Sequence, residues 1–281
     1  MRLLLGLCIS LLVACTENKE QDSGIENIEE VAPSLEIVPT EAEQAYFDYW
    51  LEQDEDFVRS LKWLPHYIHE QGELGICLRF DFESAQSIDG DLVESIRKKI
   101  EERVWEWQKG LIGQPNWIHD TPTPVQLFGI AVTPQVEVSD LPDVPLYEND
   151  NAECPNSCFR FTYKYEDNPL YTDCEHPNMS HFDFNIWYSD FDFGAAGHGG
   201  DWGTRLDWDL FLEELVDETP TVSDHELGHV AGLPDVYNYP ATLNDFTRPE
   251  CIMAHSESMK NFDYLMLRKV WEMGWEQFYA E

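Results

Sequence analysis

Basic residues are scarce in this sequence. The chain has 17 lysines and arginines against 55 aspartates and glutamates, which gives a formal net charge of −38 at pH 7. A surface this acidic repels the phosphates of nucleic acids and of anionic lipids, so we expect neither as a partner. Three explanations of the charge stay open: basic substrates, bound Ca²⁺, or solubility in salty surroundings.

The start of the chain also lacks a hydrophobic run long enough to span a bilayer. The apolar stretch from Leu3 to Ala14 is too short for that and is typical of a signal-peptide core. It ends in Leu12-Val13-Ala14-Cys15, which resembles the lipobox of bacterial lipoproteins. This resemblance implies a signal peptide over residues 1–14 and a lipidated Cys15 as the sole membrane contact. Thr16 favours the outer membrane or cell surface. An ordinary secretory signal is the alternative, and it also places the protein outside the cytoplasm.

Aromatic residues are missing from the next segment. Residues 15–40 are polar and acidic, so we expect a flexible tether. Residues 41–281 are enough for one domain with a sizeable core, and the 10 Trp, 12 Tyr and 15 Phe of the chain supply apolar bulk. The sequence has no internal repeat, and we expect a monomer.

Five cysteines remain after Cys8 in the leader and Cys15, namely Cys77, Cys154, Cys158, Cys174 and Cys251. An odd number in an oxidising compartment predicts two disulfides and one free thiol. Either Cys154 pairs with Cys158, or one of these two pairs with Cys174. A zinc site made of Cys154, Cys158, Cys174 and His176 is a further alternative.

Hydrophobic periodicity predicts alternating helices and strands. Helices are expected within 41–70, over 91–109 and 205–216, and from Thr219 or Thr221, either of which would cap the last one. Strands are expected over 75–82, 124–132, 159–165 and 181–188, with a loop over 134–156 and a glycine-rich turn over 194–203.

The most informative stretch is His225-Glu226-Leu227-Gly228-His229-Val230-Ala231-Gly232-Leu233-Pro234-Asp235. Two histidines four apart share one helix face and can both reach one Zn²⁺. Glu226 lies beside the metal as a general base. Gly232 and Pro234 end the helix and return Asp235 as the third ligand, which leaves the fourth position open, as in catalytic sites.

A competing third ligand is Glu250, 21 residues after His229. Its spacing resembles the thermolysin-like branch, in which the glutamate lies on a following helix. Pro249 and Cys251 make a helix there unfavourable, and the Gly-to-Asp turn would have no purpose.

The string from His225 to Asp235 resembles the metzincin clan of metallopeptidases, in the version with aspartate as third ligand found in snapalysin-type and immune-inhibitor-A-type enzymes. Cys251-Ile252-Met253-Ala254-His255 resembles the metzincin Met-turn, and residues 261–271 would form the closing helix. A group of fungal secreted metallopeptidase-like proteins is also similar. The resemblance implies an α+β zincin fold: a twisted mixed sheet over the active-site helix, an antiparallel edge strand at the cleft, and a short C-terminal subdomain.

One position departs from the metzincin pattern. Many metzincins have a tyrosine two residues after the Met-turn methionine, where it stabilises the oxyanion, and this sequence has His255. We take His255 as a catalytic residue, with Tyr237 and Tyr239 as alternative donors. His198, in the glycine-rich stretch, is a weaker candidate to face the cleft.

The sequence therefore predicts a secreted, lipid-anchored zinc endopeptidase acting on peptides or proteins, with the substrate held antiparallel to strand 181–188. The alternative is a surface-displayed protein that binds glycans or matrix on a zincin scaffold without hydrolysis. Ca²⁺ is a second candidate cation, with Asp183, Asp190, Asp192 and Asp201 as possible ligands. No twelve-residue calcium loop is present, so a solvated acidic face is favoured.

Overall fold

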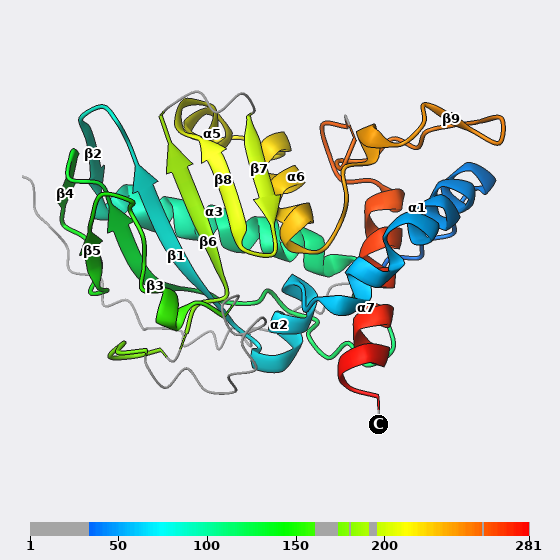
Figure 1. The fold of residues 1–281 in the computed structure, drawn as a ribbon, viewed down its shortest axis with the longest axis horizontal. Helices are drawn as coiled ribbons and strands as arrows, with labels where there is room; N and C mark the ends of the chain where they lie inside the picture. Colours follow the sequence, from blue (N-terminus) through cyan, green and yellow to red (C-terminus); the bar gives the residue numbers. More distant parts are fainter. Residues whose placement is uncertain (1–33, 161–173, 180, 191–195, 255, 281) are drawn as a thin grey trace, which may run out of the picture. The chain divides into compact units, whose positions relative to one another are not determined.

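A six-stranded sheet is the central element of the computed structural model, which describes residues 34–160, 174–179, 181–190, 196–254 and 256–280, without the side chains of Phe57 and Ser60. All neighbouring strands pair in parallel except the last, which is antiparallel to β8. The strand order is β5 (Leu146–Glu148), β3 (Val125–Val132), β1 (Leu74–Asp81), β6 (Phe184–Ser189), β8 (Gly203–Asp207) and β7 (Gly197–Gly200) (Figure 1).

The central strands are covered on both faces. Seven of the eight residues of β1 are buried, which fits its nearly continuous apolar sequence. Because side chains alternate across a strand, Ile76 and Leu78 belong to the main core, whereas Cys77 joins a smaller cluster with Phe128 and Phe182 on the other face.

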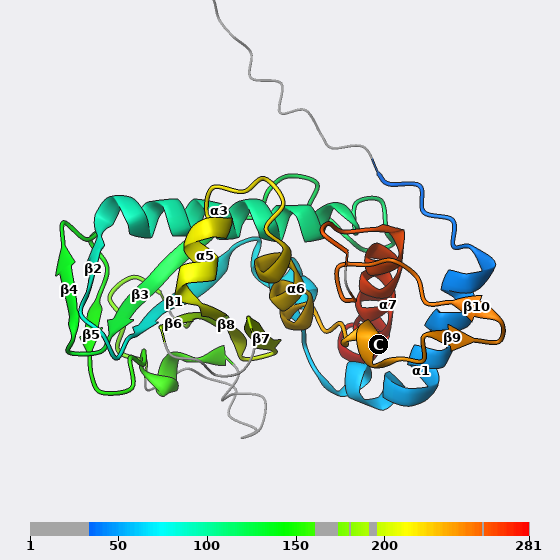
Figure 2. The ribbon, with the colours of Figure 1, turned by 90° about the horizontal axis from the view of Figure 1, so that it is seen from above.

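Three helices cover the face of the main core: α3 (Gly90–Lys109), α5 (Trp208–Glu214) and α6 (Thr221–Val230) (Figure 2). The Asp89 carboxylate caps α3 by accepting from the backbone N–H of Leu92 at 2.8 Å. The helix buries one stripe at helical spacing, formed by Val93, Ile96, Ile100, Val104 and Trp107.

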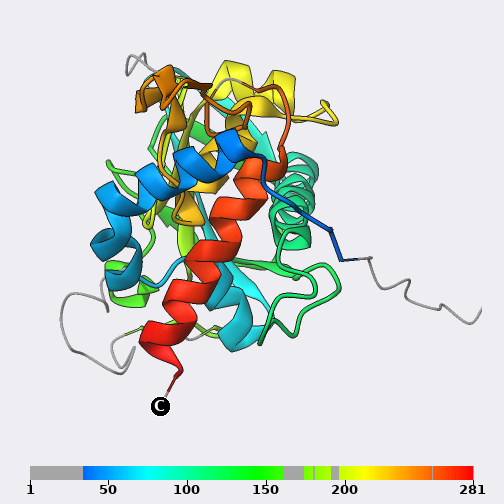
Figure 3. The same cartoon turned by 90° about the vertical axis from the view of Figure 1, so that its right-hand side faces the viewer.

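Segments from both ends of the described chain pack together beside the sheet. Helix α1 (Glu41–Ser60) lies against α7 (Asn261–Phe278), and α2 (Leu64–Gln71) also contacts α7 (Figure 3). The short helix η2 (Val236–Asn238) and the hairpin β9 (Thr242–Leu243) and β10 (Phe246–Thr247) complete this part. None of the described helices is long and apolar enough to cross a membrane.

Two disulfides join Cys77 to Cys154 and Cys158 to Cys174, while Cys251 is a buried free thiol. The predicted count of two bonds and one thiol is confirmed, and so is the alternative that Cys174 pairs with Cys158. The local Cys154–Cys158 pairing is wrong, since Cys154 reaches back to β1. The cysteine zinc site is also wrong, because all three of its thiols form disulfides.

Several predicted elements need correction. The helix predicted over 205–216 is wrong at its start, because residues 205–207 belong to strand β8 and α5 begins at Trp208. The predicted loop 134–156 contains two short strands, β5 and β4 (Val136–Ser139), and β4 pairs with β2 (Gln86–Asp89). The short helix η1 (Asn156–Cys158) begins at the last residue of that loop. The glycine-rich turn contains β7. Of the predicted strand 159–165, Phe159 forms a parallel bridge with Phe182, and residues 161–165 lie outside the described part. Very short strands carry too little periodicity to be recognised locally.

The predicted mixed sheet with packed helices is confirmed in this coarse form, as a mostly parallel sheet with one antiparallel edge strand. The finer assignment to the zincin fold stays a prediction. The C-terminal subdomain is not separate, because α1 and α2 from the other end of the described chain pack against α7.

One buried histidine lies within the α2–α7 contact. The His66 side chain is fully buried and stacks on Trp271, with 5.0 Å between ring centroids. Its Nε2 lies 3.3 Å from the carbonyl oxygen of Val270, and Gly274 leaves the space that the ring occupies. Burial lowers the pKa of His66 to about 4, so the folded protein holds a neutral imidazole where the unfolded chain binds a proton.

This histidine predicts a loss of stability in acid. Above its ordinary pKa of 6.5 the stability is complete, and it decreases as the pH falls towards 4, because only the unfolded state takes up the proton. Between pH 7 and 5 the loss from this group is about 2 kcal/mol at most. We expect His66→Gln, which cannot titrate, to lose correspondingly less unfolding free energy than the wild type in urea titrations at the two pH values. Equal losses in both proteins would contradict the assignment.

Candidate metal centre

Helix α6, which carries the motif, begins with help from its neighbour. The carboxylate of Glu214, at the end of α5, accepts from the backbone N–H groups of Val222 at 2.6 Å and of Ser223 at 2.9 Å. The residue before the helix is Pro220, which offers no side-chain cap. The predicted start at Thr221 is confirmed, but the predicted threonine cap is wrong, because a buried glutamate from another helix satisfies these donors.

The same helix is fixed to α3 by polar contacts. The indole Nε1 of Trp107 donates to the carbonyl oxygen of Asp224 at 3.1 Å, and the Arg103 guanidinium lies 3.4 Å from the Asp224 carboxylate. Burial raises the pKa of Asp224 to about 7, although Arg103 opposes this shift. These contacts set the rotation of α6, so that His225 and His229 lie on the face away from α3.

Three side chains converge at the C-terminal half of α6. The Nε2 atoms of His225 and His229 each lie 3.1 Å from one carboxylate oxygen, Oδ1 of Asp235. Gly232, at φ +94°, provides the turn that returns Asp235 to the helix. The structure therefore brings together the three predicted metal ligands.

The opposite nitrogens of both imidazoles point at backbone carbonyls. Nδ1 of His225 lies 2.8 Å from the carbonyl oxygen of Ile252, and Nδ1 of His229 lies 2.8 Å from that of Leu233. A carbonyl accepts only from a protonated nitrogen, so each Nδ1 carries a hydrogen, and each Nε2 is the nitrogen that faces Asp235 and that would bind a metal ion. Metal-binding histidines in proteins have this arrangement.

The spacing of these atoms fits a tetrahedral cation. Ligand atoms at zinc distances stand roughly 3.3 Å apart at the corners of a tetrahedron, close to the observed separations. Burial alone would raise the pKa of Asp235, but hydrogen bonds to both imidazoles hold it well below its ordinary value. Burial would lower the pKa of His225, and the hydrogen bonds to Asp235 and to the Ile252 carbonyl raise it instead. Two nitrogens and one carboxylate suit Zn²⁺.

Glu226 lies beside this group. Its Oε2 is 4.0 Å from Nε2 of His229 and is buried without a hydrogen-bond partner among the described residues. Burial raises the pKa of Glu226 to about 7, although both histidines oppose the shift. An orphaned carboxylate oxygen next to a candidate metal position can accept a proton from a bound water molecule.

The edge strand β7 lies directly against α6. A Cβ atom at Gly197 would lie 2.7 Å from Cγ and Oε1 of Glu226, and one at Gly199 would lie 2.4 Å from the Glu226 carbonyl oxygen. Only glycine allows this approach. The prediction that strand 181–188 borders the substrate is wrong, because β6 pairs on both sides with β1 and β8 and has no free edge.

The segment resembling the Met-turn lies beneath α6. Met253 is fully buried, and a Cβ at Gly228 would lie 2.2 Å from its sulfur. Its carbonyl oxygen accepts from the backbone N–H of Val236 at 2.7 Å, next to Asp235. The buried Asp263 carboxylate accepts from the N–H groups of Ile252 and Met253. The sequence did not reveal the role of Asp263, which is visible only through these contacts between α7 and the preceding turn.

The candidate oxyanion donors are placed differently. The Tyr237 ring is parallel to His225, at 6.0 Å between centroids, and its hydroxyl bonds to Asp235. Tyr239 instead packs edge-to-face on Tyr49 of α1. His255 lies outside the described residues, so its predicted role stays a prediction.

The weaker candidates are not part of this group. Glu250 is exposed and lies in a surface groove with Thr40 and Lys260, away from the histidines. His198 is exposed on β7, between the two glycines that face α6, so its side chain lies on the opposite face of the strand.

Two of the four residues proposed for Ca²⁺, Asp183 and Asp190, have separate partners. The fully buried Asp183 lies 2.6 Å from the Arg160 guanidinium and accepts from the backbone N–H of Gly75. Asp190 accepts from the backbone N–H groups of Glu83 and Ser84. Asp192 lies outside the described residues. The structure therefore gives no support for a shared calcium site.

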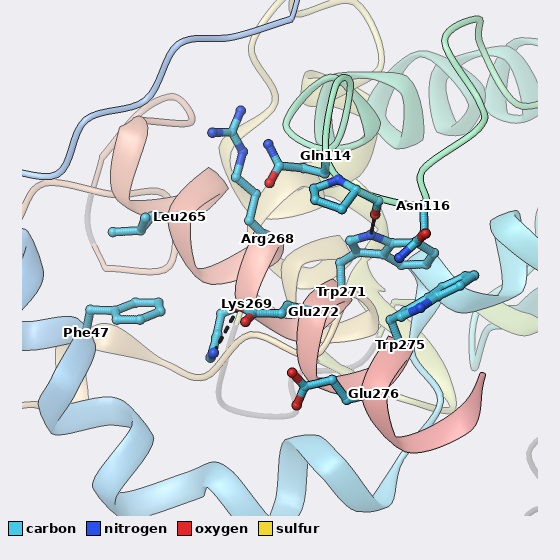
Figure 4. A pocket seen from close by; sticks show the side chains of 11 residues that line it. Phe47, Gln114, Asn116, Leu265, Arg268, Lys269, Trp271, Glu272, Trp275 and Glu276 are labelled. Atoms are coloured by element: carbon cyan, nitrogen blue, oxygen red, sulfur yellow. Dashed lines mark hydrogen bonds and ion pairs between the residues drawn. The ribbon is translucent and has the colours of Figure 1, made fainter. Parts of the chain in front are cut away.

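A pocket of about 560 Å³ lies on α7 rather than at the histidines (Figure 4). Its polar side chains are largely engaged: Arg268 donates to the carbonyls of Gly110 and Leu35, and Lys269 pairs with Glu272 at 2.9 Å. The Trp271 indole donates to the Pro115 carbonyl. Size alone therefore does not make this pocket the better candidate site.

The geometry predicts one zinc ion per chain. We expect His229→Ala and Asp235→Ala to weaken zinc binding by more than the roughly 10–100-fold that loss of an outer hydrogen-bond partner costs. Glu250→Gln should bind zinc like the wild type. Calorimetric titration of the metal-free protein with zinc measures each affinity. If the Glu250 variant lost zinc binding and the Asp235 variant kept it, Glu250 and not Asp235 would be the third ligand.

Comparisons with known proteins add little to this picture. No family model matches the chain, and no curated protein matches it in sequence. Among solved structures the chain is similar to the crystal structure of archaemetzincin from Methanopyrus kandleri, with a TM-score of 0.27 and 15% identity, over 72% of this chain and 97% of that chain. At this TM-score and identity, the likeness carries no argument about fold or function.

Proposed function

We propose that the chain is a zinc-dependent endopeptidase. The observation that supports this most is the convergence of His225, His229 and Asp235, with each imidazole oriented by a backbone carbonyl and Glu226 beside them. A purely structural zinc site would have four protein ligands. Three ligands and an adjacent, unpartnered carboxylate instead suit catalysis.

The chemistry divides between the metal and the chain. When bound, Zn²⁺ supplies Lewis acidity that polarises a carbonyl and makes water a better nucleophile. Glu226 accepts a proton from the attacking water and passes it to the leaving amine. Its buried position beside β7 shields the carboxylate from bulk solvent, so the proton stays between Glu226 and the substrate.

Strand β7 is the proposed guide for the peptide. It pairs with β8 on one side, and an extended peptide added to its other edge would be hydrogen-bonded as a further strand. Gly197 and Gly199 bring that edge next to Glu226 and His229. A peptide added antiparallel to β7 would place one of its carbonyl groups next to the two histidines.

Tyr237 is the proposed donor to the oxyanion among the described residues. Its hydroxyl is held at Asp235 and its ring lies along His225, so it borders the metal position. His255 remains the candidate that the sequence favours. A hydroxyl or imidazole donor at this place would stabilise charge that develops only in the transition state.

The alternative, a surface-displayed binding protein for glycans or matrix without hydrolysis, has less support. It would not require a carboxylate buried without a partner beside the histidines, an arrangement that costs stability. We also propose that the protein acts outside the cytoplasm, anchored through a lipidated Cys15. The two disulfides support an oxidising compartment, and residues 1–15 support the anchor by sequence alone.

Loss of the proposed base is the direct test. We expect Glu226→Gln to lower kcat for a dye-labelled casein by at least about 100-fold, because general-base catalysis contributes roughly 10²–10⁴-fold. Zinc content should stay at one ion per chain, since Glu226 is not a ligand.

The matched control is Glu213→Gln, at an exposed position of α5, which should leave the rate unchanged. Proteolysis at the wild-type rate by zinc-loaded Glu226→Gln would refute the mechanism. Zinc binding without hydrolysis of any peptide by the wild type would favour the binding-protein alternative.

A further inference from the structure

A second pocket borders the candidate metal centre. It has a volume of about 260 Å³ and is lined by His229, by the turn from Gly232 to Pro234, by the end of β7, and by residues of α1 and the α1–α2 connection. It is thus formed by three segments far apart in the sequence. Nothing in the proposed chemistry of Glu226 requires it.

Indole rings form much of the wall. Trp63 packs so closely on Gly232 that a Cβ there would lie 2.7 Å from its ring, and Trp202 packs on Gly200 in the same way. The fully buried Trp50 is a third aromatic lining residue. Such walls suit an apolar chain, or a cation held against the face of a ring.

The charged groups in the wall are acidic. Asp54 and Asp201 line the pocket, and none of its described lining residues is a lysine or arginine. Among the described residues no group forms an ion pair or hydrogen bond with the Asp54 carboxylate. Burial raises the pKa of Asp54, which is the expected effect on a partly desolvated carboxylate without a counter-charge.

We propose that this pocket is a substrate subsite that accepts a lysine or arginine side chain, with Asp54 as the residue that selects it. The inference rests on the proposed peptidase function. The methylene stem would lie against the indoles while the cationic end reaches the carboxylate. The net charge of −38 attracts basic peptides over a longer range.

The position of the pocket sets which substrate residue enters it. Along β7, Gly197 lies against Glu226, Gly199 lies against Glu226 and His229, and Gly200 is at the pocket. A peptide antiparallel to β7 runs in the opposite direction. The side chain in the pocket therefore belongs to a residue on the amino side of the cleaved bond.

Matched peptides test this proposal. The peptides differ at a single position on the amino side of the cleaved bond. We expect the zinc-loaded protein to cleave the Lys and Arg peptides with a kcat/KM at least 10-fold higher than that of the norleucine peptide. The Glu peptide should have the lowest kcat/KM. Asp54→Asn should reduce the preference for Lys over norleucine, as a ratio of kcat/KM values, at least fivefold, and the zinc content should stay at one ion per chain.

The control is Asp56→Asn, the same substitution at an exposed position of α1, which should keep the full preference. Binding gives a readout without turnover: in the Glu226→Gln background, calorimetry and the fluorescence of the pocket tryptophans should report tighter binding of the Lys peptide, lost on adding Asp54→Asn. Hydrolysis with no preference for basic residues would overturn this inference and leave the peptidase intact. If the protein hydrolysed no peptide but bound the Lys peptide in a way that depends on Asp54, the proposed peptidase function would be wrong and the proposed basic-peptide site would stand.

Discussion

The two hydrogen bonds from the histidine Nδ1 atoms to backbone carbonyls are the constraint on which the candidate site depends. Without them each imidazole could rotate or change tautomer, and the two Nε2 atoms would not converge beside Asp235. One of the acceptors, the Ile252 carbonyl, belongs to a turn that the buried Asp263 carboxylate holds through the N–H groups of Ile252 and Met253. A residue of α7 thus controls the orientation of His225 without touching it.

Close packing brings the remaining parts to this point. Gly228 allows Met253 to lie against one side of α6, and Gly197 and Gly199 allow β7 to lie against the other. Any larger residue would separate these layers, because a Cβ atom at each position would lie closer than van der Waals distance to atoms of Met253 or Glu226. The glycines are therefore needed for proximity rather than for unusual backbone angles, in contrast to Gly232, whose φ of +94° makes the turn towards Asp235.

The local parts of the site could be predicted from the sequence, and the long-range parts could not. The histidine spacing, Glu226, the glycine turn and Asp235 lie within eleven residues, where helix geometry decides the arrangement. Strand β7 was missed because a glycine-rich segment has low strand propensity and is held by pairing with β8 and by packing on α6. The Cys77–Cys154 bond joins residues that are 77 positions apart. The Glu214 cap and the Asp263 contacts span only 8 to 11 residues, but each joins two separate elements, so the periodicity of a single element does not signal them. The alternation of Gly197 and Gly199 was the one available sign of a strand face without side chains.

Asp54 and Glu226 share a physical property that most acidic residues of this chain lack. Both carboxylates are partly or fully removed from water, and neither is paired with a described lysine or arginine. Burial raises the pKa of each, to about 7 for Glu226. Asp235, in contrast, has a lowered pKa, because two imidazoles bond to it. Neighbouring carboxylates whose pKa values are shifted in opposite directions are typical of sites with divided roles. An unpaired buried carboxylate reduces the stability of the fold. Such a group is expected at a functional site, where a substrate cation or a proton neutralises its charge. The proposed subsite would make α1, which supplies Asp54, part of the working site and not merely a cover for α7.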